Sequence, residues 1–335
     1  MYANDQPTPI KLFKQLATRR NLIPNHQIQT HLDEDIAKSS SGYYGELSID
    51  FHLKYILEKI PKLSNLRMKS EFIHFEIDTL LFCVKFLLLL QVKNLAGEVT
   101  IDHRTGIMNQ KVRNDEVGYQ DPILQVEKHA RLLTKWLKSR GYDIPIETLV
   151  VFTNKNVMIQ QGPIPLDPRI VSGYKLSHAY YDLKTKYKDK PDIQNRLKLY
   201  RDLQRHNEMY DMNLLKELNL SKKDFIPGAF CNYCHTKSMQ YRRNGFECNN
   251  CKYKSQTVLE EFLKDYYLIF GHEITSDTLS EWLKIDLVTS RRLLAKQNFR
   301  TKGRKPKTHI LNYDYRTDFN YLIEYNKSLY LSKIR

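Results

Sequence analysis

The chain has 335 residues, a formal net charge of +15 and 41% hydrophobic residues, which is enough to build two or three domains with cores of their own. The excess of basic residues favours a polyanionic partner, although charge alone does not separate DNA from RNA or from an acidic membrane. A membrane span is excluded for the most apolar run, residues 80–90, because it contains Lys85 and is much shorter than the roughly 20 residues that cross a bilayer.

Glu46 is the first candidate site residue, and it follows the segment Gly42-Tyr-Tyr-Gly45. We expect a helix over residues 45–60 in which Glu46 leads an apolar stripe. The stripe consists of Ile49, Leu53, Ile56, Leu57 and Ile60. A carboxylate in that position is costly to bury unless it is paired, coordinated or near solvent. Two interpretations are open: a site residue, or a carboxylate at a helix N-terminus that backbone amides and the helix dipole stabilise.

Asp78 ends a predicted strand over residues 72–78, and Gln91-Val92-Lys93 ends the apolar strand that follows. This second strand is apolar at both its odd and its even positions, as in a central strand that is covered on both faces. Successive side chains of a strand alternate faces, so Gln91 and Lys93 share one face and Val92 turns to the other. A carboxylate, an amide oxygen that can ligate a hard cation, and a lysine are therefore expected in one cleft. This combination indicates a metal-dependent nuclease site.

Asp121 and Pro122 predict the start of another helix, with Asp121 as its N-cap and Pro122 as its first residue. Gln125 lies one turn into this helix. From the residues alone, Gln125 can be explained as a hydrogen-bonding side chain near a helix start.

In this order, the elements resemble the nuclease-related domain (NERD) family, a branch of the PD-(D/E)xK nuclease-like superfamily. The shared pieces are the glycine-flanked Glu46, Asp78 on the first strand, the Gln91-x-Lys93 unit followed by Asn94, and Asp121-Pro-x-x-Gln125. The resemblance covers about residues 40 to 160. Two departures are visible. Gln91 stands where glutamate is commonest, and Val84-Lys85-Phe86 stands where the preceding turn usually has a glycine.

The resemblance implies hydrolysis of phosphodiester bonds with Mg²⁺ or Mn²⁺ in the site. The implied metal ligands are Asp78, the Gln91 Oε1 atom, the Val92 carbonyl and Glu46, the last directly or through water. Lys93 would orient or deprotonate the attacking water and steady the charge that develops on the phosphate. Gln125 would face the same cleft.

Residues 166–225 predict a helical connector, dense in charged residues and tyrosines with leucines at helical spacing. Its tyrosines could stack on nucleic-acid bases or form an amphipathic core, and we favour the core. These tyrosines are Tyr180, Tyr181, Tyr187 and Tyr200.

Four cysteines in two C-x-x-C pairs predict a zinc ribbon over residues 226–256. They are Cys231, Cys234, Cys248 and Cys251. Their spacing is close to that of tetrathiolate Zn²⁺ sites, and a chain without a signal peptide is expected to keep its thiols reduced. Two disulfides are the alternative. His235 is expected at the surface, and Cys83 is expected to pack in an apolar strand.

Residues 257–335 are predicted to form a helix-turn-helix with a wing. Helices are expected over 258–270, from Thr275 or Ser276 to Ile285, and over 289–296, with a basic turn at 302–307. The predicted nucleic-acid contacts are Ser290, Arg291, Arg292, Lys296, Arg300, Lys302, Arg304, Lys305 and Lys307. The alternative is a small helical tail whose charges are simply solvated.

The predicted fold is an α/β domain with a mixed sheet flanked by helices and a restriction-endonuclease-like core, followed by the connector, the zinc ribbon and an α+β winged helix. The expected boundaries are 1–39 for an N-terminal extension, 40–165 for the α/β domain, 166–225 for the connector, 226–256 for the ribbon and 257–335 for the winged helix.

The predicted function is metal-dependent cleavage of DNA, with the zinc ribbon and winged helix as a basic targeting module. A non-catalytic DNA-binding or regulatory protein is the alternative, because Gln91 adds no charge to the metal site. RNA also stays open as the substrate, since no feature is known to read a 2′-hydroxyl. No targeting segment and no Gly-x-x-x-x-Gly-Lys-Ser/Thr phosphate loop is visible. We therefore expect a cytoplasmic protein that has no membrane partner and no ATP-driven motor.

Overall fold

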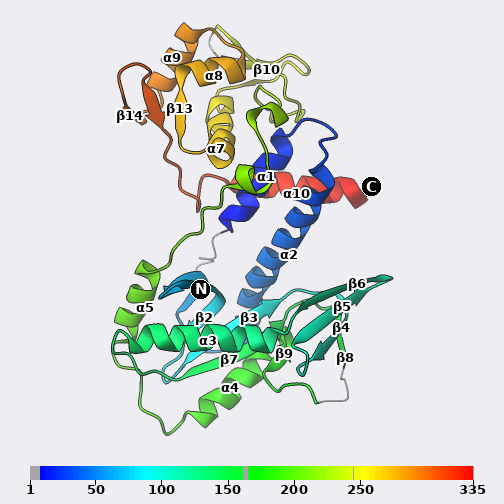
Figure 1. Ribbon diagram of the computed structural model, residues 1–335, viewed down its shortest axis with the longest axis vertical. Helices are drawn as coiled ribbons and strands as arrows, with labels where there is room; N and C mark the ends of the chain where they lie inside the picture. Colours follow the sequence, from blue (N-terminus) through cyan, green and yellow to red (C-terminus); the bar gives the residue numbers. More distant parts are fainter. Residues whose placement is uncertain (1–7, 161–164, 244, 335) are drawn as a thin grey trace. The chain divides into compact units, whose positions relative to one another are not determined.

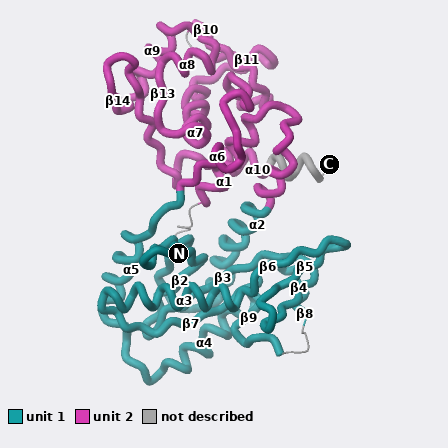
Figure 2. The backbone as a smooth tube through the Cα atoms, viewed as in Figure 1, with its two compact units in different colours: residues 1–7, 38–210 teal, residues 8–37, 211–335 magenta. Residues whose placement is uncertain are grey.

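The computed structural model describes residues 8–160, 165–243 and 245–334, with the backbone alone over 328–334. The described residues form two compact units, shown in teal and magenta in Figure 2. The first unit comprises residues 38–210, and the second comprises residues 8–37 together with the chain from residue 211 onward. Most of the expected N-terminal extension thus belongs to the second unit, and the expected connector divides between the two.

A mixed five-stranded sheet forms the centre of the first unit, in the order β1-β2-β3-β7-β9 (Figure 1). Its strands are β1 Lys62–Ser70, β2 Ile73–Phe82, β3 Leu87–Lys93, β7 Ile146–Phe152 and β9 Ile170–Ser172. β1, β2 and β3 pair antiparallel, whereas β3, β7 and β9 pair parallel. β3 is buried on both faces from Leu87 to Val92, as its unbroken apolar run predicts. The expected mixed α/β architecture is confirmed.

Helices cover both faces of this sheet. α3, Pro122–Lys138, and α5, Arg196–Arg205, pack on one face. The C-terminal part of α2, Gln29–Leu53, and α4, Leu176–Lys186, pack on the other. Because alternate strand residues point to opposite faces, the run Leu87–Leu90 contributes two leucines to each of the two cores.

The prediction of a helix over residues 45–60 is wrong at both ends. α2 begins well before residue 45, because Leu32 and Ile36, one turn apart, are both buried and extend the apolar stripe. It ends before Leu57, whose N–H donates to the Tyr181 hydroxyl and whose side chain is 91% exposed. Leu57 therefore does not belong to the core-facing stripe.

A second sheet that no sequence pattern predicted is formed mainly by the segment between β3 and α3. Its strand order is β6-β5-β4-β8. The strands are β4 Gly97–Asp102, β5 Ile107–Val112, β6 Asp115–Gln120 and β8 Val157–Gln160. β6 is exposed along its whole length, whereas Val99, Ile101 and Met108 join the core that α3 covers.

The second unit combines helices with two small antiparallel sheets. Its helices, besides the first turns of α2, are α1 Ile10–Asn21, α6 Leu214–Glu217, α7 Val258–Phe270, α8 Ser276–Leu283, α9 Leu287–Ala295 and α10 Asn320–Ile334. One sheet, β10-β11-β12, consists of Met239–Arg242, Gly245–Cys248 and Lys254–Ser255. The other sheet has the order β13-β15-β14 and consists of Glu273–Thr275, Thr308–Ile310 and Arg300–Lys302. Short 3-10 turns occur at Gly173–Lys175 in the first unit and Lys222–Asp224 in the second.

A buried carboxylate joins α1, α7 and α10 within the second unit. Asp265 on α7 is 4% exposed and accepts hydrogen bonds from Asn21 Nδ2 at 2.9 Å and from the Tyr321 hydroxyl at 2.6 Å. Arg20 Nε lies 3.4 Å from Asp265 Oδ2, and the Arg20 guanidinium lies 4.2 Å from the centroid of the Phe230 ring. These contacts explain why the N-terminal helix belongs to this unit.

We expect Asp265→Ala to lower the free energy of unfolding of the second unit by about 3–5 kcal/mol, because it leaves the buried Arg20 guanidinium unpaired. Each unit contains one of the two tryptophans, so urea denaturation followed by Trp282 fluorescence in a Trp136→Phe background reports on this unit. Glu324→Ala, which removes an exposed partner of Lys327, is the matched control and should cost less than about 1 kcal/mol. Equal losses in the two variants would show that Asp265 does not hold the unit together.

Candidate functional site

Asp78 and the end of β3 meet where the pairing between β2 and β3 stops. The last paired residues are Thr79 and Leu90. Beyond them, Asp78 Oδ2 accepts hydrogen bonds from Gln91 Nε2 at 2.6 Å and from the Val92 N–H at 2.7 Å. The carboxylate and the amide predicted to share a site therefore touch.

The predicted strand over residues 72–78 differs from β2 at both ends. β2 continues to Phe82, because its last four residues pair with β3, so Asp78 lies inside the strand. Phe72 lies in the turn before β2 and is exposed. Asp78 marks the end of the ladder between two strands, not the end of its own strand.

Burial dominates the electrostatics of Asp78. Removal from water raises its pKa to about 6, while the Val92 N–H and the Lys93 ammonium lower it and the neighbouring Glu76 raises it. The carboxylate is thus ionised only at a cost, which a cation bound beside it would relieve.

Lys93 is fixed by the helix that Asp121 begins. Lys93 Nζ donates to Gln125 Oε1 at 3.0 Å. Gln125 occupies the first turn of α3, where Asp121 is the N-cap and Pro122 the first residue, as predicted. Burial lowers the pKa of Lys93, and the attraction of Asp78 opposes this shift. We call Asp78, Gln91, Val92, Lys93 and Gln125 the Asp78 cluster.

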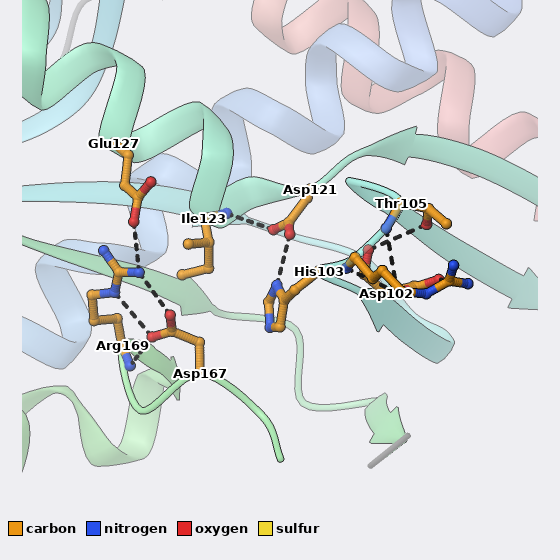
Figure 3. Close-up of polar contacts among 9 residues, drawn as sticks. Asp102, His103, Thr105, Asp121, Ile123, Glu127, Asp167 and Arg169 are labelled. Atoms are coloured by element: carbon orange, nitrogen blue, oxygen red, sulfur yellow. Dashed lines mark hydrogen bonds and ion pairs between the residues drawn. The ribbon is translucent and has the colours of Figure 1, made fainter. Parts of the chain in front are cut away.

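Two further contacts hold α3 in place (Figure 3). The fully buried Asp121 carboxylate accepts from the Ile123 N–H at 2.8 Å and from His103 Nδ1 at 2.6 Å. Farther along the helix, Glu127 accepts from Arg169 Nη2 at 2.8 Å, and the same guanidinium group binds Asp167. The helix that positions the partner of Lys93 is thereby anchored at two points.

Helix α2, which carries Glu46, packs tightly on Asn94, the residue that follows Lys93. A Cβ at Gly45 would lie 2.5 Å from Asn94 Cβ, so only glycine fits there, and Asn94 Nδ2 donates to the Ser41 carbonyl at 2.9 Å. Glu46 follows Gly45, and Asn94 follows Lys93. Since α2 begins at Gln29, Glu46 lies in its interior, and the alternative of a carboxylate at a helix N-terminus is wrong.

The donor set fits a hard divalent cation. Gln91 directs its amide nitrogen toward Asp78, while its Oε1 atom is buried and has no hydrogen-bond partner among the described residues. A buried acceptor without a donor is unusual and costs free energy. Carboxylate and amide oxygens are the ligands that Mg²⁺ and Mn²⁺ favour.

Sequence reasoning missed His129, one turn beyond Gln125 on α3. Burial, with smaller contributions from Lys128 and Lys93, lowers its pKa to about 4, so the ring is neutral near Lys93. Its Nδ1 atom is buried without a hydrogen-bond partner among the described residues, and the ring centroid lies 6.2 Å from that of Phe75. The i, i+4 spacing from Gln125 is the signal that could have found it.

The four cysteines of the second unit converge on one point. Their Sγ atoms all lie within 4.8 Å of one another, with 3.5 Å between Cys231 and Cys251 and 3.6 Å between Cys234 and Cys248. A tetrahedron with Zn–S bonds of about 2.3 Å has edges of about 3.8 Å, whereas a disulfide bond is about 2 Å long. The arrangement therefore fits a single thiophilic ion such as Zn²⁺, and not two disulfides.

Hydroxyl groups support this cysteine cluster. Thr236 Oγ1 lies 3.0 Å from Cys234 Sγ, and this hydrogen bond lowers the pKa of the Cys234 thiol. Ser238 Oγ lies 3.0 Å from Cys248 Sγ. Such contacts favour thiolates, which are the form that binds metal. Cys83 lies in the apolar core of the first unit, where burial raises the pKa of its thiol to about 12.

All but one of the predicted nucleic-acid contacts are exposed, on α9 and its C-cap residue, on β14, and on the hairpin between β14 and β15. They are Arg291, Arg292, Lys296, Arg300, Lys302, Arg304, Lys305 and Lys307. The exception, Ser290, is fully buried and donates to the Ser276 carbonyl at 2.6 Å, so it joins α9 to α8 and does not face solvent. α9 begins two residues earlier than expected because Asp286 caps it by accepting from the Thr289 N–H.

Comparison with known protein families finds a match for part of this chain. Residues 41–153 match the family model of the nuclease-related domain, NERD, a range that includes Glu46 and the whole Asp78 cluster. No curated protein and no solved structure matches the chain. Among the described residues, no helix combines the length and apolarity needed to cross a membrane.

The first prediction from the site concerns the cost of the Asp78 carboxylate. In the metal-free chain its folded pKa, about 6, lies above the ordinary value of 3.8. The folded state thus binds a proton at Asp78 more tightly than the unfolded state does. The stability gained from this difference is fully present below pH 3.8 and is lost as the pH rises through 6. Asp78→Asn keeps an oxygen acceptor without the charge. We expect it to raise the free energy of unfolding near neutral pH by about 1–3 kcal/mol, and to have little effect at about pH 4.

Urea denaturation of the first unit, followed by Trp136 fluorescence in a Trp282→Phe background, measures this effect. Glu71→Gln, at an exposed carboxylate in the turn before β2, is the control and should show no such pH dependence. Addition of Mg²⁺ should stabilise the parent but not Asp78→Asn. If Asp78→Asn were less stable than the parent at neutral pH, the ionised Asp78 carboxylate would not be costly to the fold.

The second prediction concerns the cysteine cluster. Protein purified without chelator should contain one zinc ion per chain by elemental analysis, and Cys231→Ser with Cys234→Ser should abolish this content and unfold the ribbon. A large part of the roughly 10–16 kcal/mol typical of structural zinc is then lost, while the first unit keeps its own unfolding transition. Cys83→Ala is the control and should retain the metal. Protein without zinc would contradict the assignment.

Proposed function

We propose that the chain is a divalent-metal-dependent nuclease that cleaves phosphodiester bonds of DNA. The observation that carries the proposal is the Asp78 cluster, in which Asp78 and Gln91 are 2.6 Å apart and Gln91 Oε1 has no partner among the described residues. The cluster lies inside the range that matches the nuclease-related domain. A carboxylate, an unsatisfied oxygen and a lysine in one place are the groups that phosphodiester hydrolysis requires.

In this proposal Mg²⁺ or Mn²⁺, when bound, supplies a Lewis acid for the phosphate and a more acidic water. The residues that would hold it are Asp78, Gln91 through Oε1, Val92 through its carbonyl and Glu46. Lys93 Nζ is held 3.0 Å from Gln125 in the cluster, and burial, which lowers the pKa of Lys93, favours the neutral amine that would accept a proton from the attacking water. Its ammonium form stabilises charge on the phosphate.

The second unit would hold the nucleic acid. The order α7-β13-α8-α9-β14-β15, with a three-stranded antiparallel sheet, supports the winged-helix interpretation. The proposed contacts are the eight exposed basic residues of α9, β14 and the following hairpin. Ser290 is no longer proposed, because it is buried. In the winged-helix interpretation α9 is the recognition helix and the basic hairpin is the wing.

One observation favours a second function, that of a DNA-binding or regulatory protein without catalysis. Gln91 Nε2 and the Val92 N–H already satisfy Asp78 Oδ2 without a cation. In this case the cluster would only stabilise the fold, and the basic surface of the second unit would carry the function.

The experiment is to incubate the purified chain with plasmid, linear DNA, single-stranded DNA and RNA, with Mg²⁺ or Mn²⁺. We expect cleavage of DNA, and we expect Asp78→Ala and Lys93→Ala each to reduce the rate by at least about 100-fold while DNA binding survives. Lys69→Ala, at an exposed lysine of β1, is the control and should cleave at the parental rate. Undiminished cleavage by both cluster variants would contradict the catalytic assignment.

Gln91→Glu separates the two candidate functions. An added carboxylate binds Mg²⁺ more strongly than an amide, so the metal concentration for half-maximal cleavage should fall. Identical metal titrations for parent and variant would show that Gln91 is not a ligand. If neither protein cleaves any substrate with either metal, the non-catalytic function is the better conclusion.

A further inference from the structure

Two tyrosine rings lie exposed beside the cysteine cluster of the second unit. Tyr233 lies between Cys231 and Cys234 and is 73% exposed, and Tyr253 follows Cys251 by two residues and is 40% exposed. Their ring centroids are 5.9 Å apart and their planes differ by only 19°. The two rings therefore form an offset stack, and both side chains are still partly exposed to solvent.

The backbone around these rings is held by the cysteine cluster. Tyr233 occupies the two-residue loop of a C-x-x-C pair, and the Tyr253 carbonyl accepts from the Cys248 N–H at 2.8 Å. An ion bound by the four thiolates would close both loops. Little conformational entropy is then left to lose when a ligand packs on the rings.

The other tyrosines named as candidate stacking residues do not offer such a surface. Tyr180 is 2% exposed, and Tyr187 packs on Phe86 with ring centroids 4.9 Å apart. The preference for an amphipathic core in that segment is confirmed. The stacking surface is on the ribbon instead.

Basic side chains continue from the tyrosine pair into a groove. The groove, of about 840 Å³, is lined on the ribbon by Arg242, Arg243, Lys254 and Gln256, among others. Lys254 adjoins Tyr253 in the chain, and its partner Glu247 is 3.6 Å away. The net charge of the lining is positive, which suits a phosphate backbone.

Helix α9 contacts the strand that also carries one residue of this groove. Arg292 Nη2 donates to the hydroxyl of Tyr241 on β10 at 3.2 Å. The residue after Tyr241 is Arg242, which lines the groove. The basic residues of α9 and those of the groove therefore both adjoin β10.

We propose that Tyr233 and Tyr253 stack on unpaired bases of a single-stranded nucleic acid whose phosphates follow Arg242, Arg243 and Lys254. In a duplex the faces of the bases are covered by their neighbours, so only a single strand, an end or a displaced strand presents a base to this surface. The pairing of a stacking surface with a basic groove is the usual means of binding single strands. The proposal goes beyond cleavage of DNA and does not require that the Asp78 cluster be catalytic.

The test is fluorescence anisotropy of the full chain with short labelled nucleic acids: oligo-dT, oligo-U, an abasic strand of equal charge, and a duplex closed at both ends by abasic loops, which presents no unpaired base and no end. No divalent metal is added, so nothing is cleaved, and no chelator is used, because chelator would remove the cysteine-bound ion. The variants are Tyr233→Ala and Tyr253→Ala, with Tyr→Phe and Tyr→Leu at the same positions. Tyr174→Ala, at a 69% exposed tyrosine of the first unit, is the matched control.

We expect each alanine variant to weaken binding of the unpaired strand by roughly 5- to 150-fold and to leave binding of the duplex and the abasic strand unchanged. Phenylalanine should preserve binding, and leucine, which keeps a large apolar side chain without a π face, should not. Zinc content and Trp282 fluorescence should match the parent in all variants. Weakening confined to oligo-dT or to oligo-U would identify DNA or RNA as the source of the bases.

Equal loss on the single strand, the duplex and the abasic strand would overturn the proposal, because the rings would then act without stacking on bases. No loss in either alanine variant, or full binding by the leucine variants, would overturn it as well. A parent that binds single strands through these rings but cleaves no DNA with Mg²⁺ or Mn²⁺ would overturn only the nuclease proposal.

Discussion

The carboxylate of Asp78 is the constraint around which the first unit is organised. Taking a charge out of water is costly, and the rise of its pKa to about 6 reflects that cost. The Gln91 amide, the Val92 N–H and the Lys93 ammonium offset part of it, so three consecutive residues of β3 must lie beside Asp78. The pairing of Leu87–Leu90 with β2 sets their positions, because it ends directly before Gln91.

The second unit also buries a carboxylate, that of Asp265, but there the carboxylate stabilises the fold. Donors from α1 and α10 surround Asp265 and compensate its charge, so the carboxylate holds these two helices against α7. In the Asp78 cluster, by contrast, Gln91 Oε1 has no partner among the described residues. Gln91 Oε1 can therefore still accept a hydrogen bond or bind a cation.

The two proposed sites also differ in what makes them rigid. Sheet packing and the anchored start of α3 fix the Asp78 cluster, so its geometry depends on a core of many residues. The tyrosine pair depends on four sulfur atoms and two short loops. A small domain can present a fixed binding surface in this way without a large core, because metal binding supplies the folding free energy that burial would otherwise provide.

The sequence by itself determined the features that depend on neighbours in the chain. The apolar run of β3 gave a strand covered on both faces, the Asp121-Pro122 pair gave a helix start, and the cysteine spacing gave a four-sulfur cluster. These three predictions are correct because periodicity, capping and metal-loop geometry depend on residues that are close together in the chain. The position of Gln125 beside Asp78, Gln91 and Lys93 was accessible only through family resemblance, since no local pattern brings a helix to these strands.

The tertiary structure decided what depends on distant partners. The N-terminal helix belongs to the second unit because Asp265, far along the chain, binds Asn21 and Arg20. Ser290 does not belong to the basic surface, because it is buried and its hydroxyl donates a hydrogen bond to the Ser276 carbonyl. Likewise, the pKa of His129 is lowered by burial and, to a smaller extent, by the nearby Lys128 and Lys93. In each case the energy of a polar group is set by what surrounds it after folding, and sequence spacing does not contain that information.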